Sequence, residues 1–346
     1  MKKNILVIAA AIACFTMAAQ PSLGGDGASH RHPGARVDVL VDNDLCGDGD
    51  GLFHLIHQLL CTSSEVKGIV GAHVGAGSRS WAQTRNEGTA KNNAEISVSR
   101  ANEILELLGR SGEVAVMAGA PGPMTDSRTA IQSEGAKLII EEARKASPER
   151  PLYLLFGGPL TDIASAWLMD PSISRNVVLV WIGGQEYPFG HPFPPEHLKG
   201  RNLVEYNLRL DVNAAMTVFN DSDLVIWQVP RDVYRESMYS MAELDDKIFP
   251  LGKIGAYLSG KIGGFARFAD TYVLGDSPLC LISTLTTTFE PGAAGSFYVE
   301  TKAPHITDEG LYDFSRPNRN IIVYNTIDTR LLFSDMESRF RLQAKK

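Results

Sequence analysis

Hydrophobic residues gather in short segments that alternate with segments of helical periodicity from residue 37 onward. Segments rich in branched and aromatic residues predict strands at residues 37–41, 66–72, 113–119, 151–157, 176–184 and 223–230. Between and after them, apolar residues recur at helical spacing and predict helices at residues 52–60, 101–108, 135–146, 160–169 and 211–220. The pattern therefore predicts a regular alternation of strands and helices.

This alternation indicates the fold class. Strands that are apolar almost throughout are typical of parallel strands that helices cover on both sides. We therefore expect an α/β fold with a doubly wound, mainly parallel sheet and helices on both faces. Neither a linker nor a repeat interrupts residues 36–340, which predicts a single domain. In such sheets, ligands bind at the carboxyl ends of the strands.

The first residues follow a different pattern. Lys2 and Lys3 precede an apolar run that ends in small residues near Ala18 and Ala19, as in a signal peptide. We interpret residues 1–25 as a signal peptide with a polar leader, and expect a periplasmic or secreted protein. The run is shorter than the roughly 20 apolar residues of a membrane span. Lipid attachment at Cys14 is the less favoured alternative.

Charge and cysteine content argue against several classes of protein. The net charge is −7 and no Lys/Arg-rich run occurs, whereas a nucleic-acid partner requires a basic surface. After the leader, Cys46, Cys61 and Cys280 are few and scattered, which predicts neither a disulfide framework nor a zinc site. Cys61 falls on an apolar helical face and is interpreted as part of the core.

The most unusual segment is VDNDLCGDGDG, residues 41–51, directly after the first predicted strand. It contains four aspartates that would repel one another if ionised, namely Asp42, Asp44, Asp48 and Asp50. Carboxylate oxygens suit a hard cation such as Ca²⁺, although Cys46 breaks the pattern of an EF-hand loop. A solvated turn and a phosphoryl-transfer aspartate at Asp42 are the alternatives.

Other candidate residues also follow predicted strands. His73 comes after the second strand and Gly157 ends the fourth. Residues 185–202, which are rich in proline and aromatic residues, predict either a lid or a surface loop. His54 and His57 lie on the first predicted helix and are interpreted as packed helical histidines.

The acidic segment resembles the D-T-D-x-G-x-D-D signature of the inosine–uridine-preferring nucleoside hydrolases. Further segments occur in that family's order, namely GGPLTDIASAW, VVLVWIGG, EYNLRLDVNAA and LGDSPL. Together they cover most of residues 37–285. The resemblance implies a calcium-assisted N-glycosidase with a doubly wound core.

The positions that match the family's motifs imply a metal site. Asp44 matches the aspartate that binds Ca²⁺ and activates the attacking water. Asp50 matches an aspartate that grips the ribose hydroxyls and approaches the metal. Gly157 matches a residue that binds the metal through its carbonyl oxygen, and Asp276 matches the last metal carboxylate.

The resemblance also implies sugar contacts. Glu205 and Asn207 match the pair that holds the sugar, although a structural polar pair is the alternative. His73 falls near a family asparagine that touches the sugar.

Two positions depart from the family pattern. Gly51 replaces the second aspartate of the D-D pair, so either Asp48 replaces it as a metal ligand or the site has one carboxylate fewer. Gly275 stands where many relatives have the histidine that protonates the departing base. Aromatic residues are candidates to stack on that base or to pack in the core, namely Tyr187, Phe189 and Tyr272.

We therefore predict hydrolysis of the N-glycosidic bond of a ribonucleoside to ribose and a free base, with Ca²⁺ as the cofactor. The partner is a small nucleoside or ribosyl compound, and a homo-oligomer is possible by analogy with relatives. One alternative is a hydrolase of another glycoside. The other is a sugar-binding or nucleoside-binding protein without turnover, which Gly51 and Gly275 favour.

Overall fold

The fold is taken from a computed structural model that describes residues 34–74, 93–189, 204–262, 269–285, 295–316 and 318–346. The predicted signal peptide and residues 190–202 of the proline-rich segment lie outside these ranges. Residues 34–346 form one compact unit. Within the described ranges, no helix has the length and apolar character needed to cross a membrane.

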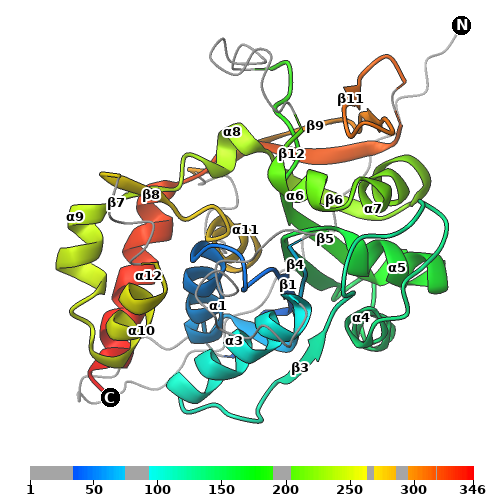
Figure 1. Cartoon of the computed structure of the whole chain (residues 1–346). Helices are drawn as coiled ribbons and strands as arrows, with labels where there is room; N and C mark the ends of the chain where they lie inside the picture. The colour runs from blue at the N-terminus through cyan, green and yellow to red at the C-terminus, as the bar shows by residue number, and fades with distance from the viewer. Residues whose placement is uncertain (1–33, 75–92, 190–203, 263–268, 286–294, 317) are drawn as a thin grey trace, which may run out of the picture. The chain divides into compact units, whose positions relative to one another are not determined.

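An eight-stranded sheet forms the centre of this unit (Figure 1). Its order across the sheet is β3-β2-β1-β4-β5-β6-β12-β9, in which all neighbours are parallel except β12 and β9. The bounds are β1 (Val37–Asn43), β2 (Ser64–Gly71), β3 (Ala115–Ala118), β4 (Leu152–Gly157), β5 (Val177–Ile182), β6 (Val225–Val229), β9 (Phe297–Lys302) and β12 (Asn320–Thr326). Because the chain runs outward from β1 to β3 and then returns to β4, the strand order reverses between β1 and β4.

Helices lie on both faces of the sheet, with α1, α3 and α11 on one side and α4, α5 and α7 on the other (Figure 1). The longer helices are α1 (Asp50–Leu60), α3 (Asn93–Leu107), α4 (Glu134–Lys145), α5 (Thr161–Met169), α10 (Gly252–Ile262), α11 (Pro278–Thr284) and α12 (Thr329–Ala344). The shorter ones are η1 (Pro171–Asn176), α6 (Tyr206–Leu210), α7 (Val212–Met216), η3 (Thr217–Asp221), α8 (Arg231–Tyr234), α9 (Met241–Glu243) and η4 (Leu244–Ile248). Two small antiparallel pairs complete the described part, β7 (Met238–Ser240) with β8 (Thr271–Val273) and β10 (His305–Ile306) with β11 (Tyr312–Asp313).

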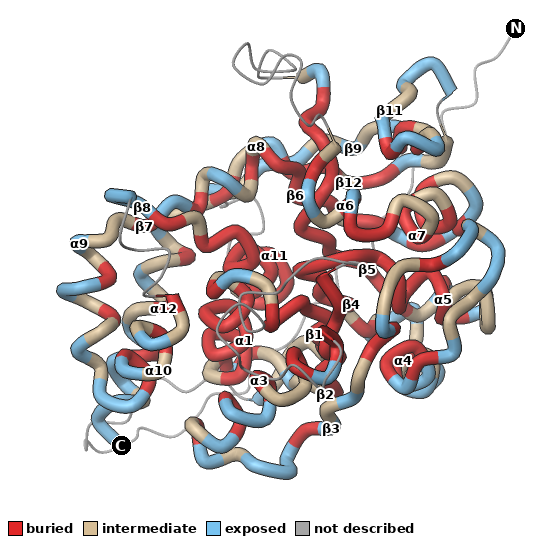
Figure 2. Tube along the Cα trace, viewed as in Figure 1, coloured by how far each residue is buried: buried red, intermediate tan, exposed pale blue. Residues whose placement is uncertain are grey.

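The predicted fold class is therefore confirmed. All the predicted strands belong to the sheet, whereas β9 and β12 were not predicted. Val39 and Val41 of β1 pack into the core on one face, and Leu40 packs into the core on the other. Figure 2 shows the central strands buried along their lengths, which is why their sequences are apolar almost throughout.

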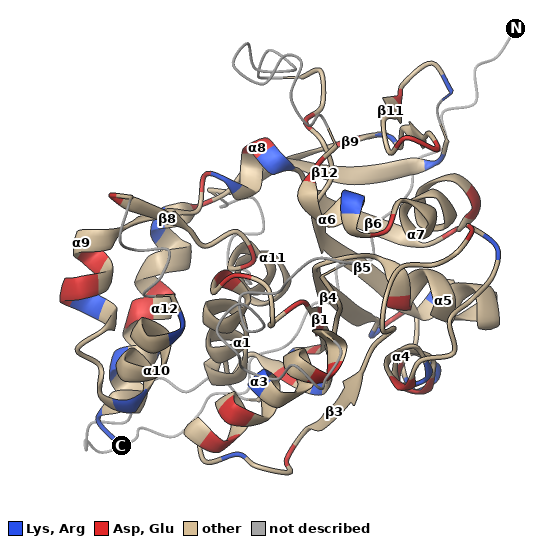
Figure 3. Ribbon diagram, viewed as in Figure 1, with Lys and Arg blue, Asp and Glu red and all other residues tan. Residues whose placement is uncertain are grey.

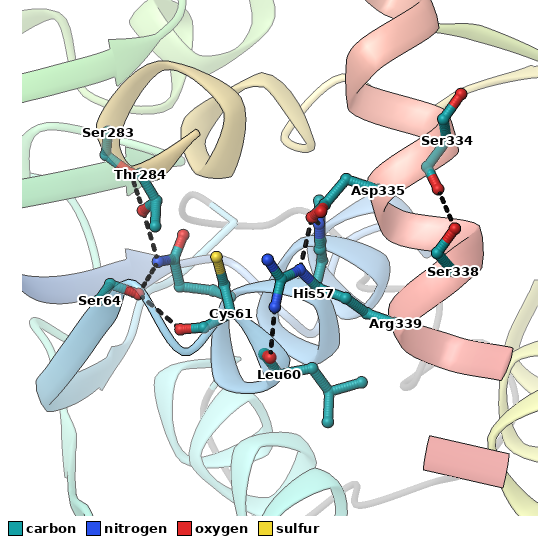
Figure 4. Close-up of polar contacts among 11 residues, drawn as sticks. His57, Leu60, Cys61, Ser64, Ser283, Thr284, Ser334, Asp335, Ser338 and Arg339 are labelled. Carbon is teal, nitrogen blue, oxygen red and sulfur yellow. Dashed lines mark hydrogen bonds and ion pairs between the residues drawn. The ribbon is translucent and has the colours of Figure 1, made fainter. Parts of the chain in front are cut away.

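A polar cluster joins the end of α1 to α12 (Figure 4). Arg339 donates from Nη1 to the carbonyl of Leu60 at 2.9 Å, which satisfies a carbonyl at the end of α1. Its Nε donates to Asp335 at 2.5 Å, and the same carboxylate oxygen lies 2.8 Å from Nε2 of His57. Burial lowers the pKa of His57 below its usual value. His57 is therefore a packed helical histidine with a structural partner.

We expect Asp335→Ala to lower the free energy of unfolding by about 2 kcal/mol, because an imidazole and a guanidinium lose their shared acceptor. Urea unfolding followed by tryptophan fluorescence measures this loss. Ser338→Ala on the same helix is the control. Its exposed hydroxyl donates only to the carbonyl of Ser334, so the change should stay within about 0.5 kcal/mol. Equal losses in both variants would contradict the structural role of the cluster.

Candidate active site

A cavity of about 460 Å³ opens at the carboxyl ends of β4 and β5, beside the loop that follows β1. Its size suits a small ligand. The cavity lies near the point where the strand order reverses, which is the expected position in a doubly wound sheet. Predicted site residues that line it are Asp44, Asp48, Asp50, Gly157, Glu205, Asn207 and Asp276.

The loop after β1 is held in a tight turn. Asp44 is buried with 8% of its surface exposed, and the amide of Gly47 donates to its carbonyl oxygen at 2.6 Å. The amide of Gly49 donates to the hydroxyl of Tyr272 at 2.7 Å, and α1 then begins at Asp50. Tyr272 thus anchors the acidic loop from β8.

Asn43, the last residue of β1, organises the floor of the cavity. Its Nδ2 donates to Oδ2 of Asp276 at 2.9 Å. Gly157 is the partner of Asn43 in the parallel pairing of β1 and β4, and a Cβ at Gly157 would lie 2.2 Å from Nδ2 of Asn43. Only glycine fits at this position, because any side chain would collide with the bonded pair.

The same asparagine accounts for the departure at Gly51. A Cβ at Gly51 would lie 2.3 Å from Oδ1 of Asn43 and 3.2 Å from Oδ2 of Asp276. Asn43 stands where the family signature has a threonine, so its longer side chain fills the space that a residue at 51 needs. An aspartate at 51 is therefore incompatible with the observed position of Asn43.

Glu205 and Asn207 approach the cavity from α6. Glu205 is almost fully buried and caps this helix, because its Oε2 accepts from the amides of Gly184 and Leu208 at 2.9 and 3.0 Å. Its Oε1 accepts from the hydroxyl of Tyr234 at 2.9 Å. Asn207 donates from Nδ2 to the carbonyl of Ile182 at 2.9 Å. Both residues thus have structural partners and also line the cavity.

The cavity is strongly acidic. Figure 3 shows acidic residues where α1 begins, beside α11. Burial raises the pKa of Asp44 well above its usual value, and the charges of Asp276, Asp48 and Glu205 raise it further. Burial also raises the pKa of Asp276 to about 8, against the hydrogen bond from Asn43 that lowers it. Among the described residues that line the cavity, Arg235 is the one basic side chain.

These carboxylates supply oxygen donors of the kind that hard cations prefer. Within the described ranges, however, no three side chains of His, Cys, Asp or Glu converge as a metal-binding group. The predicted ligands therefore share one cavity without forming a closed ligand set. The donor chemistry and the mutual repulsion fit a cation, and Oδ1 of Asn43 is a buried oxygen with no hydrogen-bond donor among the described residues.

Other predicted residues lie elsewhere. His73 is fully buried and is not among the described lining residues, although its neighbour Val74 is. Its Nε2 lies 2.9 Å from Oγ1 of Thr161. Tyr187 packs in an aromatic cluster with Phe189 and Tyr312, which corresponds to the packing alternative.

The sequence did not single out three residues that line the cavity, Tyr206, Tyr234 and Arg235. Tyr206 lies between Glu205 and Asn207, which the EYN motif identified, so the same motif could have indicated Tyr206 as a site residue. Tyr234 and Arg235 follow β6, and their position after a predicted strand could have indicated them as site residues.

Comparison with known proteins identifies the family. The sequence profile of the inosine-uridine preferring nucleoside hydrolases matches residues 87–326. The chain belongs to this family. The predicted resemblance is confirmed, and N-glycosyl hydrolysis is the activity of the family, whose members are metal-dependent. The match begins after residues 41–51, so the acidic loop lies outside it.

Solved nucleoside hydrolases share the fold. A plant nucleoside hydrolase has a TM-score of 0.63 at 17% identity, covering 88% of this chain and 99% of its own. A purine-preferring ribonucleoside hydrolase from Gardnerella vaginalis has a TM-score of 0.64 at 17% identity, covering 89% and 99%. An inosine-uridine preferring nucleoside hydrolase from Bacillus anthracis has a TM-score of 0.60 at 17% identity, covering 88% and 99%. A search of curated protein sequences gives no match.

The raised pKa of Asp276 predicts how stability depends on pH without a divalent cation. The folded protein holds a proton that the unfolded carboxyl loses above pH 3.8, so the free energy of unfolding falls as pH rises toward 8. The buried histidines have lowered pKa values and so oppose this fall in stability only below pH 6.5. Above that pH they are neutral in both the folded and the unfolded protein. Between pH 6.5 and 8 we expect a fall of about 1 kcal/mol per pH unit.

Urea unfolding in the presence of a chelator, repeated across this pH range, measures the fall. Asp276→Asn should give a shallower slope because it cannot release the proton. Asp126→Asn, at an exposed turn, should keep the slope of the unmodified protein. A flat profile in the unmodified protein would rule out the protonated Asp276.

The conflict between Asn43 and position 51 predicts coupled effects on stability. Gly51→Ala should cost about 2 kcal/mol by overpacking, although alanine favours a helix more than glycine does. Asn43→Thr should cost about 1 kcal/mol through the lost bond to Asp276. The double variant should lose at least about 0.5 kcal/mol less than the sum, because threonine frees the space.

Gly122→Ala is the matched control, since a Cβ there meets nothing within 4 Å. Its free energy of unfolding should change by less than about 0.5 kcal/mol. Strict additivity in the double variant would show that Asn43 does not restrict position 51.

Proposed function

We propose that this protein hydrolyses the N-glycosidic bond of a ribonucleoside to ribose and a free base. The observation that carries this proposal is that five carboxylates line one cavity at the ligand-binding edge of a nucleoside hydrolase fold, namely Asp44, Asp48, Asp50, Glu205 and Asp276. Breaking a ribosyl C–N bond builds positive charge on the sugar. Carboxylates fixed around the ring stabilise that charge.

Asp44 is the proposed general base. Its carboxylate lines the cavity just after β1, and burial raises its pKa well above the usual value. A raised pKa makes the ionised carboxylate a stronger base. It would accept a proton from the water that attacks the anomeric carbon. Asp50, Glu205 and Asn207, which also line the cavity, would bind the ribose hydroxyls. His73 stays a proposed residue on the sugar side. It is not among the described lining residues, but its neighbour Val74 is.

The part of the cavity that would face the departing base differs from that of many relatives, because Gly275 stands where they have a histidine. A Cβ at Gly275 would lie 3.4 Å from Cδ2 of Tyr234, so the tyrosine ring borders this position. The partly buried phenol of Tyr234 has a pKa that burial raises, and it donates to Glu205. Arg235 beside it would stabilise negative charge on the base by hydrogen bonding, since a guanidinium stays protonated.

Calcium is the proposed cofactor. Its ligands would come from Asp44, Asp48, Asp50, Asp276 and the carbonyl of Gly157, which supply oxygens only. When bound, Ca²⁺ would polarise a water and neutralise part of the carboxylate repulsion. Asp48 lines the cavity close to Asp50, whose pKa is raised by burial and by the charges of Asp276 and Asp48, and this proximity supports the proposed role of Asp48 in place of a residue at 51.

Glycine at 51 and at 275 favours a second candidate, a nucleoside-binding or sugar-binding protein with little or no turnover. Both positions lack side chains that many relatives use in catalysis. Release of reducing sugar from nucleosides, abolished by a chelator, supports the hydrolase. Thermal stabilisation by ribose or nucleosides without release supports the binding protein. Release from another glycoside alone would favour a different hydrolase.

We further propose that the protein is exported to the periplasm or secreted, where hydrolysis of nucleosides would serve salvage. The basis is the charged and apolar pattern of residues 1–25. A homo-oligomer is proposed only by analogy with the family. Cell fractionation with an antibody against the folded protein tests the location.

We expect Asp44→Asn to lower kcat by about 10³-fold, because the amide cannot accept the proton from water. Steady-state release of ribose from a screen of nucleosides measures the change, with circular dichroism to verify folding. Asp126→Asn removes an exposed carboxylate that is not among the described lining residues and should leave kcat unchanged. Near-normal turnover of Asp44→Asn would exclude Asp44 as the base.

A further inference from the structure

A buried chain of polar side chains connects the end of β2 to α5 and α7. Its members are His73, Thr161 and Asp211, which are 0%, 0% and 2% exposed. His73 follows β2, Thr161 is the first residue of α5, and Asp211 precedes α7, which packs against α5 (Figure 1). Consecutive members lie 88 and 50 positions apart in the sequence, so the chain exists only in the folded protein.

Asp211 is the acceptor end of this chain. Its Oδ1 accepts from the amide of Ala214 at 2.9 Å and so caps α7. Its Oδ2 accepts from the amide of Met124 at 2.9 Å and from the hydroxyl of Thr161 at 2.6 Å. Burial raises the pKa of Asp211, whereas these hydrogen bonds lower it. Three donors around two oxygens favour the ionised carboxylate, which can only accept.

The hydroxyl of Thr161 fixes the direction of the second hydrogen bond. A hydroxyl has one proton, and Thr161 donates it to Asp211. Nε2 of His73 lies 2.9 Å from the same hydroxyl oxygen, so Nε2 carries a proton and donates it. Burial lowers the pKa of His73 to about 4, so the ring is neutral near neutral pH. A neutral imidazole with its proton on Nε2 has an acceptor at Nδ1.

His73 lies close to the floor of the candidate site. The amide of the preceding residue, Ala72, donates to the carbonyl of Asn43 at 2.9 Å, directly after the last paired residues of β1 and β2. The following residue, Val74, lines the cavity. The segment that carries His73 is therefore held between the organising asparagine of the floor and the cavity wall.

We propose that Thr161, held by Asp211, is a positioning residue that keeps His73 in the Nε2–H tautomer and so makes Nδ1 an acceptor for a hydroxyl of the sugar. The tautomer follows from the hydrogen bonds of the three buried side chains, whereas the contact with the sugar rests on the proposed function. A sugar hydroxyl suits this acceptor because it has a proton to donate. Asp211 and Thr161 thus act on the ligand through His73 and do not touch it.

Nitrogen NMR of the histidine rings tests the tautomer directly. The full chain is produced with nitrogen-labelled histidine, and two-bond proton–nitrogen spectra near neutral pH distinguish a protonated ring nitrogen from an unprotonated one by its chemical shift. His73→Asn assigns the signal of His73 by its disappearance. We expect a proton on Nε2 and none on Nδ1. A proton on Nδ1 of His73 in the unmodified protein would overturn the proposal.

Variants at position 161 test the positioning role. Thr161→Val keeps the shape of the side chain but removes the acceptor for Nε2, and should give a mixture of the two tautomers of His73. Thr161→Ser keeps the hydroxyl and should retain the Nε2–H signal. Thr62→Val, at an exposed turn after α1, is the control and should leave the spectrum unchanged. An unchanged His73 signal in Thr161→Val would contradict the role of Thr161.

Kinetics separate this proposal from the proposed function. With a nucleoside that the protein hydrolyses, Thr161→Val should lower kcat/KM about tenfold, which corresponds to one hydrogen bond, and Thr161→Ser by less than about twofold. A mixture of tautomers with unchanged kcat/KM would overturn the contact with the sugar. If no nucleoside is hydrolysed, the proposed hydrolysis fails, and thermal stabilisation by ribose decides the contact instead. Ribose should then stabilise the unmodified protein more than Thr161→Val, and equal stabilisation, or none, would contradict the contact.

Discussion

The hydrogen bond between the amide of Asn43 and the carboxylate of Asp276 is the contact on which the candidate site depends. It links the end of β1 to the segment before α11, and so joins parts of the chain that are more than 200 residues apart. Gly157 approaches this pair so closely that no side chain fits there, and Gly51 is excluded from carrying one by the same asparagine. One polar contact therefore sets the spacing of β1, β4, α1 and α11 around the cavity.

The floor that this contact builds is electrostatically unfavourable without a ligand. Five carboxylates face a single guanidinium among the described lining residues, and burial raises the pKa of Asp44, Asp50 and Asp276. Such a cluster lowers stability when it is ionised and unpaired, and gains most from a ligand or cation of positive character. The repulsion within the cluster and its suitability for a developing positive charge have the same physical origin.

The frame around the cavity is held from the other end of α1. Arg339 satisfies a terminal carbonyl of this helix and pairs with Asp335, and Gln58 of α1 donates to the hydroxyl of Thr284 in α11. The helices that carry Asp50 and follow Asp276 are thus fastened at a distance from the site. Enzymes commonly hold the helices around an active site by contacts at a distance from it, because a site that contains repelling charges requires a rigid support.

Local patterns along the chain determined much of this protein. The apolar strands with intervening helical periodicity specified a doubly wound parallel sheet, because burial on both faces leaves a direct imprint on composition. The acidic segment, Glu205, Asn207 and Asp276 were identifiable because each follows a strand or matches a family motif. β9 was missed because it is largely exposed and lacks a continuous apolar run. β12 was missed although residues 321–324 form an apolar run.

Only the tertiary structure decided which residues meet. The incompatibility of Asn43 with a side chain at 51 and the cavity wall formed by Tyr234 and Arg235 both depend on segments that only packing brings together. Local propensity reports burial and periodicity, whereas these features depend on distances between side chains that packing alone brings together.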